Sequence, residues 1–407
     1  MTETTLDACL EAPHRIDPGF GQDPYPFLNA LREAGPVHRV LLPDGSESWW
    51  VTGYDEVNAC LEDHDRFSSQ VHNAVADKRI QNSQALIRKD DMLRLVMINR
   101  DPPDHTRMRK LVVRAFGATE VARLRPRIEQ IADRLLDGMA GRESAELVQD
   151  YAFPVPVNVI CLLLGIPYSD SAVLGGFVTR MVGASGPEEA LAAIGGLKEF
   201  MTEKIAEKRA HPADDILTSL VRATDDGTLH GLELPAMALQ ILSAGHESSI
   251  FLISAGVFNL LRNPEQLAAV RADPALLPRA VEEMVRYEPP PVPGVFRHAT
   301  EDVPVGGTVI PAGSLVILSL AAANRDAGHF PNPDAFDVLR QPNPHLSFGS
   351  GIHYCLGAKL ARVEGEIAIG ALLRRFPELR LAVPAERITR RPLNFLQRLD
   401  ALPVLLH

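Results

Sequence analysis

Apolar residues recur every three to four positions over most of the chain, which is the period of an amphipathic or buried helix. This spacing predicts helices within residues 121–164, with an interruption at the proline-rich residues 153–156, and again over residues 280–287. The longest apolar run covers residues 235–261 and stops before an Asn-Pro pair, so we expect one long helix there. The chain is therefore predicted to be mainly helical.

Strand-like patterns are short and few. Residues 37–42 and 49–52 alternate on either side of a Pro-Asp-Gly turn, which predicts a β-hairpin. Apolar runs at residues 308–310 and 315–318 predict two more strands, and the proline-rich residues 289–296 are predicted to be extended. The expected fold class is mainly α with a minor β region.

Two stretches have weaker signals. Residues 68–99 lack a clear period and predict a long loop with a short helix, and loops of this length in compact domains are usually functional. Residues 170–200 are rich in alanine and glycine, which predicts helices of low intrinsic stability. No linker, repeat or low-complexity tract divides the chain, so residues 1–407 are expected to form a single large domain, with 1–20 as a poorly ordered leader.

The net charge of −11 over 407 residues argues against nucleic acid as a partner, because binding to phosphates requires a basic surface. The first residues have neither a basic flank nor an apolar core, so no signal peptide or membrane anchor is expected. The helix at 235–261 is long enough to cross a membrane, but Gln240, His246 and Glu247 interrupt it, which favours a buried core helix. We therefore expect a soluble, cytoplasmic, monomeric protein without a membrane partner.

Cysteine chemistry is concentrated at one position, Cys355, in the glycine-rich residues 348–357 directly before a helix-forming run at 358–364. Free N–H groups and the dipole of a helix N-terminus favour a negative charge, which lowers a thiol pKa. No second cysteine or histidine lies at metal-pair spacing, so a thiolate here suits a metal held by another scaffold, such as haem iron. From this loop alone, a nucleophilic cysteine and a packed thiol stay open as alternatives. The other cysteines are expected to be packed or unused thiols: Cys9, Cys60 and Cys161.

The full pattern Phe-Gly-x-Gly-x-His-x-Cys-x-Gly resembles the haem-ligand loop of the cytochromes P-450, and the likeness runs from about residue 20 to the C-terminus. The resemblance implies the cytochrome P-450 fold, with haem b (iron protoporphyrin IX) as cofactor. It makes Cys355 the iron ligand and includes Gly357 among the haem contacts. It also places Phe348 beside the sulfur and His353 within reach of a haem propionate.

Two further segments carry basic side chains that suit the propionates. His105 and Arg109 are four residues apart in a predicted helix and therefore share one face. Taken alone, such a pair is more often solvated surface, but it resembles the family's propionate-binding helix. Arg297, after the proline-rich segment, resembles the family's second propionate clamp.

The middle of the long helix carries the second chemical signal, because polar residues in a buried helix need partners or a function. The small residues Ala244 and Gly245 allow a flat ligand to lie against the backbone, and Glu247 and Ser248 place an acid beside an alcohol. The segment resembles the family's oxygen-activating segment, in which an acid and a threonine pass protons to dioxygen. Ser248 stands at the threonine position and lacks the β-methyl group that restricts the rotamer. A purely structural Ser-Ser pair stays open as an alternative.

Glu283 and Arg286 are three residues apart on one helical face, where ion pairs are common and weak. The pair resembles the Glu-x-x-Arg signature of the family, a structural pair behind the haem loop. Members of the family often add a third arginine, but Ala335 occupies the expected position here. We therefore expect an incomplete triad, in which some other group satisfies Glu283.

The resemblance also implies a substrate pocket and a docking surface. The candidate substrate contacts are Val96, Met97, Val292, Val295, Phe296, Asn394 and Phe395. Core packing accounts equally well for residues 96–98, and an ordinary turn accounts for Asn394. A basic patch for an acidic electron donor is predicted from Arg107, Lys110, Arg114, Lys359 and Arg362. Scattered solvated charges are the alternative account of that patch.

Together these signals predict a haem-thiolate monooxygenase that inserts one oxygen atom of dioxygen into an apolar small molecule, by hydroxylation or epoxidation. The resemblance is closest to bacterial members that modify secondary metabolites such as polyketides, macrolides or terpenoids. Electrons are expected from a ferredoxin and a ferredoxin reductase, because the chain has no flavin or nicotinamide domain. Two alternatives stay open. One is a peroxide-driven peroxygenase, against which the Glu247–Ser248 pair counts, and the other is a haem-thiolate sensor without turnover.

Overall fold

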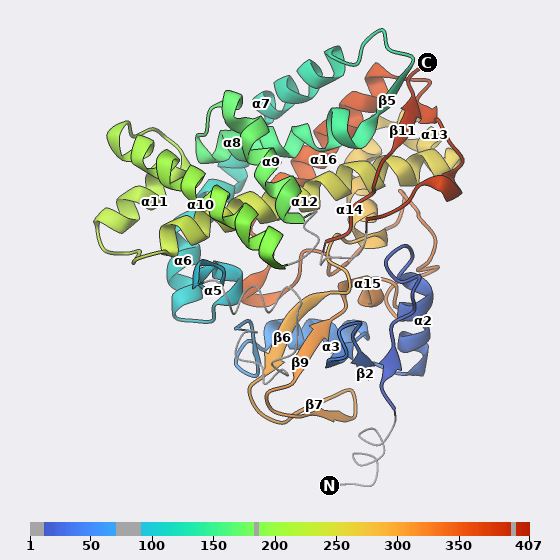
Figure 1. The fold of residues 1–407 in the computed structure, drawn as a ribbon. Helices are drawn as coiled ribbons and strands as arrows, with labels where there is room; N and C mark the ends of the chain where they lie inside the picture. Colours follow the sequence, from blue (N-terminus) through green and yellow to red (C-terminus); the bar gives the residue numbers. More distant parts are fainter. Residues whose placement is uncertain (1–11, 71–90, 183–186, 392–395) are drawn as a thin grey trace.

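The long apolar helix expected from the sequence is α12 (Glu233–Arg262), and it runs through the larger, helical part of the molecule (Figure 1). The smaller part contains most of the strands. Of the apolar stretch of α12 that is long enough to cross a membrane, 78% is buried inside the protein, as expected of a core helix. The computed structural model describes residues 12–70, 91–182, 187–391 and 396–407.

The other helices of the larger part pack on α12 or on its neighbours, with α8, α10, α14 and α16 in direct contact with it. The predicted interruption at residues 153–156 is misplaced, because the helix break follows the end of α7 at Asp137, whereas α8 begins at Pro154 and accommodates its prolines in the first turn, where proline is tolerated. These helices are α5 (Asp91–Leu95), α6 (Asp104–Val112), α7 (Ala118–Asp137), α8 (Pro154–Leu164), α9 (Ser171–Val182), α10 (Pro187–Ala210), α11 (Ile216–Asp225), α13 (Pro264–Ala272), α14 (Leu277–Tyr287) and α16 (Ala358–Arg375). Short helical turns are η2 (Met97–Asn99), η3 (Val113–Phe116), η4 (Val148–Ala152), η5 (Tyr168–Asp170), η6 (Pro274–Leu276), η7 (Gly351–His353) and η8 (Ala385–Arg387).

The alanine- and glycine-rich stretch forms the helix pair α9 and α10, which pack against each other. Two of its glycines sit under aromatic rings. A Cβ atom at Gly175 would approach the ring of Phe153 to 2.9 Å, and one at Gly196 would approach the ring of Phe177 still more closely. The glycines that weaken these helices therefore also allow aromatic side chains to pack directly on the backbone.

A six-stranded sheet with the strand order β1-β2-β3-β9-β6-β4 forms the centre of the smaller part. The predicted hairpin is confirmed as β2 and β3, with Val37 opposite Val51. β9 pairs in parallel with β3 and antiparallel with β6, which carries Arg297. The strands are β1 (His14–Arg15), β2 (Val37–Leu41), β3 (Glu47–Val51), β4 (Phe67–Ser68), β6 (Val295–Ala299) and β9 (Leu315–Leu318), flanked by α2 (Tyr25–Ala34), α3 (Tyr54–Glu62) and α15 (Leu320–Ala323).

Two small sheets complete the β region. β7 (Val303–Val305) and β8 (Thr308–Ile310) form a two-stranded ribbon, and β10 (Arg380–Leu381), β11 (Pro403–Leu405) and β5 (Ser144–Glu146) form a three-stranded sheet. β5 lies inside the stretch where only helices were predicted, and that part of the prediction is wrong. The three residues form a strand because β11, near the C-terminus, pairs with them.

The start of the chain differs from the expected leader of residues 1–20. Residues 1–11 lie outside the described residues, but β1 pairs in parallel with β2 and the ring of Phe20 packs against Trp50. The ordered chain therefore begins earlier than predicted. Of the three cysteines expected to be packed or unused, Cys60 and Cys161 are buried free thiols, and Cys9 lies outside the described residues.

Candidate active site

The Cys355 loop is closed by the backbone and packs tightly on α3. The Cys355 amide donates to the Phe348 carbonyl at 2.8 Å. Gly351 has a φ of +66°, in the left-handed region that favours glycine, and a Cβ atom there would meet the Leu61 carbonyl oxygen at 2.8 Å. Helix α16 begins at Ala358, three residues after the cysteine, where the sequence predicts a helix.

The half-buried sulfur of Cys355 lies at the N-terminus of α16. Burial opposes ionisation of the thiol, whereas backbone N–H groups of Gly357 and Ala358 and the charges of Arg109 and Arg362 favour it. Burial is the larger effect, and the pKa of the Cys355 thiol is raised above its ordinary value. The lowered pKa expected from the helix terminus is therefore wrong for this thiol. A metal ion bonded to the sulfur would reverse the balance, because a coordinating thiol is deprotonated outright.

Two basic side chains of α6, His105 and Arg109, meet His353 of this loop. The rings of His105 and His353 lie 4.3 Å apart, and His353 Nε2 is 2.9 Å from the hydroxyl of Ser69. Arg109 Nη2 donates to a backbone carbonyl of the Cys355 loop at 2.6 Å. Burial, with the charge of Arg109, lowers the pKa of His105 to about 4, and burial with neighbouring positive charges also lowers the pKa of His353.

Arg297 adds a fourth basic group from β6, and only 6% of it is exposed. Its Nη1 donates to the Phe296 carbonyl at 2.7 Å, and burial lowers the pKa of its guanidinium to about 10. Within the described ranges, neither Arg297 nor Arg109 has a carboxylate within 4.0 Å, and both ring nitrogens of His105 are buried without a partner. Buried cations are costly without anions. The cluster therefore fits a dicarboxylate, and haem has two propionate groups.

Ala244 is exposed in the middle of α12, although the turns on both sides of it are mostly buried. Gly245 has a different environment from the one expected. A Cβ atom there would collide with the side chain of Ile160 on α8. The small size of Gly245 thus allows α8 and α12 to approach closely. Of the two small residues, only Ala244 presents an exposed apolar surface, and the face of α12 on which it lies is called the open side.

Glu247 is buried and turned into the protein. Arg398 Nη1 donates to Glu247 Oε1 at 3.2 Å, and His246 Nε2 lies 3.2 Å from the same oxygen. Burial opposes ionisation, but His246 and Arg398 outweigh it and hold the pKa of the Glu247 carboxyl below its ordinary value. Ser248 Oγ donates to the Ala244 carbonyl one turn earlier at 2.7 Å, a bond that helical serines often make. The acid is therefore an ion-paired carboxylate.

A second buried acid, Glu364 of α16, is joined to the same segment through Ser249. The Ser249 hydroxyl donates to Glu364 Oε2 at 3.1 Å, while Oε1 has no partner among the described residues. Burial raises the pKa of Glu364 to about 8, so this carboxyl is neutral at pH 7. Sequence reasoning missed Glu364. Its position on the same helical face as the apolar residues Leu360 and Ile367, both buried, could have indicated a buried acid.

Glu364→Gln is expected to raise the melting temperature at alkaline pH and to change it little near pH 5. The folded protein keeps this proton up to about pH 8, whereas the unfolded chain loses it near pH 4.5. Between these values the unfolded state binds fewer protons, so stability falls as the pH rises, by roughly 2–5 kcal/mol in total. Glutamine is neutral in both states and avoids this loss. Melting of the haem-loaded protein at about pH 5, 7 and 9 measures the effect, with Glu366→Gln as control. A difference from wild type that does not change with pH would contradict it.

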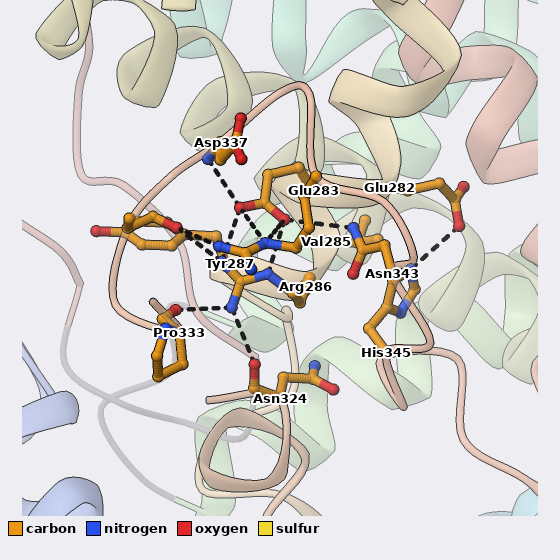
Figure 2. A network of polar contacts seen from close by, with 12 residues as sticks. Glu282, Glu283, Val285, Arg286, Tyr287, Asn324, Pro333, Asp337, Asn343 and His345 are labelled. Carbon is orange, nitrogen blue, oxygen red and sulfur yellow. Dashed lines mark hydrogen bonds and ion pairs between the residues drawn. The ribbon is translucent and has the colours of Figure 1, made fainter. Parts of the chain in front are cut away.

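Glu283 and Arg286 of α14 form the predicted pair within a larger buried network (Figure 2). Arg286 donates to both carboxylate oxygens at 2.7 Å, and the Asp337 amide adds a bond of 2.9 Å. Arg340 Nε lies 3.2 and 3.1 Å from the same two oxygens, and Asn343 Nδ2 lies 3.3 Å from one of them. The expectation that another group satisfies Glu283 is confirmed, and that group is an arginine at position 340, so the trio of one carboxylate and two arginines is complete although Ala335 stands at the usual position.

The same network supports the chain that leads into the Cys355 loop. Ser347 Oγ donates to the Val285 carbonyl of α14 at 2.6 Å. His345 Nε2 lies 3.1 Å from Glu282 Oε2, a contact that is drawn as a dashed line in Figure 2. These contacts end directly before Phe348, so the position of the loop depends on α14.

The predicted substrate contacts differ in burial. Val96 and Met97 are buried in the main core, 7% and 6% exposed. Val292 is fully buried in the cluster between α2 and the sheet, so core packing accounts for it. Val295 and Phe296 begin β6 and are half-buried. Two further predicted contacts lie outside the described residues: Asn394 and Phe395.

Comparison with known proteins identifies relatives over almost the whole chain. The family model described as Cytochrome P450 matches residues 188–387. Cytochrome P450 107B1 of Saccharopolyspora erythraea is 44% identical over 392 residues, which is 96% of both chains. Cytochrome P450 monooxygenase PikC of Streptomyces venezuelae is 42% identical over 389 residues, which is 95% of this chain and 91% of PikC. The solved structure of the tirandamycin C-bound P450 monooxygenase TamI matches with a TM-score of 0.89 at 39% identity, over 97% of this chain and 100% of TamI.

These likenesses confirm the predicted fold class, mainly α with a minor β region, and the predicted haem cofactor. The cluster of basic side chains beside the Cys355 loop, with buried Arg297 and half-buried Arg109 as its cations, is consistent with a cofactor that carries two carboxylates. With more than 40% identity to two named members over nearly its full length, this chain is a haem-dependent monooxygenase of the cytochrome P450 family.

Proposed function

We propose that this monooxygenase hydroxylates or epoxidises an apolar secondary metabolite such as a polyketide, macrolide or terpenoid. The observation that carries the proposal is the exposed apolar surface of Ala244, which lies within one turn of Glu247 and Ser248 on an otherwise buried helix. An apolar surface beside an acid and an alcohol suits a molecule that binds by burial of carbon and reacts by proton-coupled chemistry. The binding of tirandamycin C by the relative TamI supports the substrate class.

The haem-holding residues of this proposal are those that the structure brings together. Cys355 is the iron ligand, Phe348 lies beside it, and a Cβ atom at Gly357 would meet no protein atom within 4 Å, which leaves room next to the sulfur. When bound, the haem supplies the activation of dioxygen, and a thiolate ligand favours cleavage of the O–O bond. The side chains that hold the propionates are His105, Arg109, Arg297 and His353.

Glu247 and Ser248 are proposed to supply protons to the reaction. The hydroxyl of Ser248 donates to the Ala244 carbonyl, and a rotation about χ1 redirects that proton to an acceptor on the open side of α12. Glu247 is held as a carboxylate and can therefore take up a proton from water and restore the one that Ser248 gives away. Ala244 remains a passive surface against which substrate and cofactor lie.

Ser248→Thr is expected to leave product formed per NADH consumed equal to wild type or up to about twofold higher. The added methyl group restricts χ1, so the hydroxyl spends less time in orientations that deliver no proton. Release of hydrogen peroxide and formation of product are measured together with a substrate that shifts the haem spin state. Ser254→Thr, at a buried serine six residues further along α12, is the control for added bulk. A marked rise of peroxide in Ser248→Thr alone would contradict the role of this hydroxyl.

Electrons are proposed to come from a ferredoxin and its reductase, with the protein in the cytoplasm. Of the basic side chains expected on the docking surface, Arg107 is engaged by Glu233 and Arg362 by Glu282. Three cationic side chains stay exposed, and the structure gives them no ion pair within the described ranges: Lys110, Arg114 and Lys359. Exposed Val113 is next to Arg114 in sequence, and exposed Tyr354 contacts Arg109 and Arg362. A charged patch with apolar members is typical of transient protein docking.

Turnover with defined components tests the proposed function. The haem-loaded protein is titrated with tirandamycin C, a macrolactone, a terpenoid and a long-chain fatty acid, and the low- to high-spin optical shift is recorded. Compounds that produce a shift are then incubated with NADH, a ferredoxin and its reductase. We expect an oxygenated product from at least one apolar metabolite. NADH consumption without product from any compound would contradict the proposal, and equal product from hydrogen peroxide alone would favour the peroxygenase.

A further inference from the structure

Arg398 reaches the acid of α12 from a segment 151 residues further along the chain. Its side chain is 2% exposed and that of Glu247 is 4% exposed, so this ion pair is buried. The other side chain beside Glu247 Oε1 is His246 of the same helix, whose Nδ1 lies 2.9 Å from the Leu242 carbonyl oxygen. Among the described residues, Arg398 is therefore the ion-pair partner that comes to Glu247 from outside α12.

The backbone around Arg398 is held against the proline-rich segment that leads to β6. The Gln397 amide donates to the Pro290 carbonyl at 2.9 Å, and Leu396 and Pro291 form an antiparallel bridge. Arg398 follows directly on these two paired residues, and Pro290 and Pro291 lie in the segment that leads to the proposed substrate contacts Val295 and Phe296. The position of the Glu247 carboxylate is thus linked to that segment by one continuous set of contacts.

The hydrogen bonding of the Arg398 guanidinium is incomplete, which is not expected of an ion pair that serves stability alone. Its Nε and Nη2 are buried without hydrogen-bond partners within the described part of the chain, and the guanidinium lies 5.4 Å from the ring of Phe153. Buried donors without acceptors reduce stability and are most often retained where they serve a function. Arg398 thus donates from Nη1 to Glu247, whereas its Nε and Nη2 make no hydrogen bond among the described residues.

We propose that Arg398 is a positioning residue that holds Glu247 ionised and in place beside Ser248 for proton delivery. The inference rests on the proposed proton-supplying role of Glu247. Without a cation from outside the helix, a buried carboxyl holds its proton more firmly or turns toward water, and in either case it no longer passes a proton on to Ser248. The two residues before Arg398, Leu396 and Gln397, are paired with Pro291 and Pro290, so the backbone next to Arg398 is supported from outside its own segment.

A cycle of variants tests this inference in the haem-loaded protein: Arg398→Met, Glu247→Gln and the two combined, with the exposed Arg387→Met as control. Product per NADH consumed is measured with the compound of the panel above that gives the largest spin shift, together with the melting temperature and the spin-shift Kd. We expect Arg398→Met to lower product per NADH at least threefold, with the Kd unchanged within twofold. The combined variant should be no worse than Glu247→Gln, and Arg398→Lys should recover more than half of the loss.

The outcomes separate this inference from the proposed function. If Arg398→Met lowers the melting temperature but keeps wild-type product per NADH, Arg398 is structural and the inference is overturned. If losses from Glu247→Gln and Arg398→Met multiply in the combined variant, Arg398 does not act through Glu247. If Glu247→Gln itself has no effect, the proposed role of Glu247 fails and the inference falls with it. Should Arg398→Met not yield haem-loaded protein, Arg398→Gln removes the charge, keeps N–H donors and is judged by the same criteria.

Discussion

Cys355→Ser is expected to abolish oxygenated product and to remove the haem-thiolate absorbance of the reduced, carbon monoxide-bound protein. A serine hydroxyl has a far higher pKa than a thiol, and the alcohol cannot supply the soft, negatively charged sulfur that the proposed iron bond requires. The loop itself should persist, because its closing bond joins the backbone of residue 355 to the Phe348 carbonyl and does not use the side chain. The fold is therefore expected to survive the loss of activity.

Cys161→Ala is the matched control for this experiment. Cys161 is a buried free thiol of α8, outside the Cys355 loop, so its removal tests the effect of losing a sulfur atom from the core. Circular dichroism and the absorbance of the reduced, carbon monoxide-bound form are recorded for both variants and wild type. We expect the control to keep the haem-thiolate spectrum. A normal spectrum in Cys355→Ser would remove Cys355 from its proposed role.

Glu283→Gln is expected to prevent the recovery of haem-loaded protein or to lower its melting temperature severely. The carboxylate lies between Arg286 and Arg340, and the side chains of this trio are 6% exposed or less. Breaking one buried ion pair costs about 3–5 kcal/mol, and here one charge serves two arginines. A typical domain has only about 5–15 kcal/mol of stability in total. Because α14 also holds Ser347, the Cys355 loop should lose its support together with the network.

Glu282→Gln is the control, since it removes the neighbouring carboxylate from the same helix. Glu282 pairs with Arg362 and His345, but its side chain is 28% exposed, so water can replace part of each contact. We expect a loss of about 1 kcal/mol from this change. Haem content after gel filtration and the melting temperature are compared for the two variants. Equal stability of Glu283→Gln and Glu282→Gln would mean that the buried network does not hold the fold as described.

Elements with a local signal could be predicted from the sequence. The hairpin of β2 and β3, the long helix α12 and the helix after Cys355 each show their period or turn within a short window. β5 could not be predicted, because three residues without a pattern become a strand only through pairing with β11. Phe20 likewise belongs to the ordered part of the chain because it packs on Trp50.

Most basic residues of the candidate site could also be predicted from the sequence, because they lie in short segments, near turns and helix starts, that resemble those of the family. The structure brings His105 and His353 within 4.3 Å although they lie in distant segments. Arg340 and Arg398 were not foreseen. Each reaches its carboxylate through the path of a loop, and no spacing along the chain encodes that path. The proposed roles of His105 and His353 toward haem, and of Arg398 toward proton delivery, stay predictions until the variants are made.

From the sequence by itself, the resemblance of the full Phe-Gly-x-Gly-x-His-x-Cys-x-Gly pattern to the cytochromes P-450 implied the class of reaction and predicted the sulfur on which it depends, because that pattern is contiguous and is readable without a fold. The tertiary structure alone decided which groups are charged. Burial raises the pKa of Cys355 and Glu364, whereas the partners of Glu247 lower its pKa. Ionisation depends on solvent access and on distances of a few ångströms between segments far apart in the chain, and these are properties of the folded molecule.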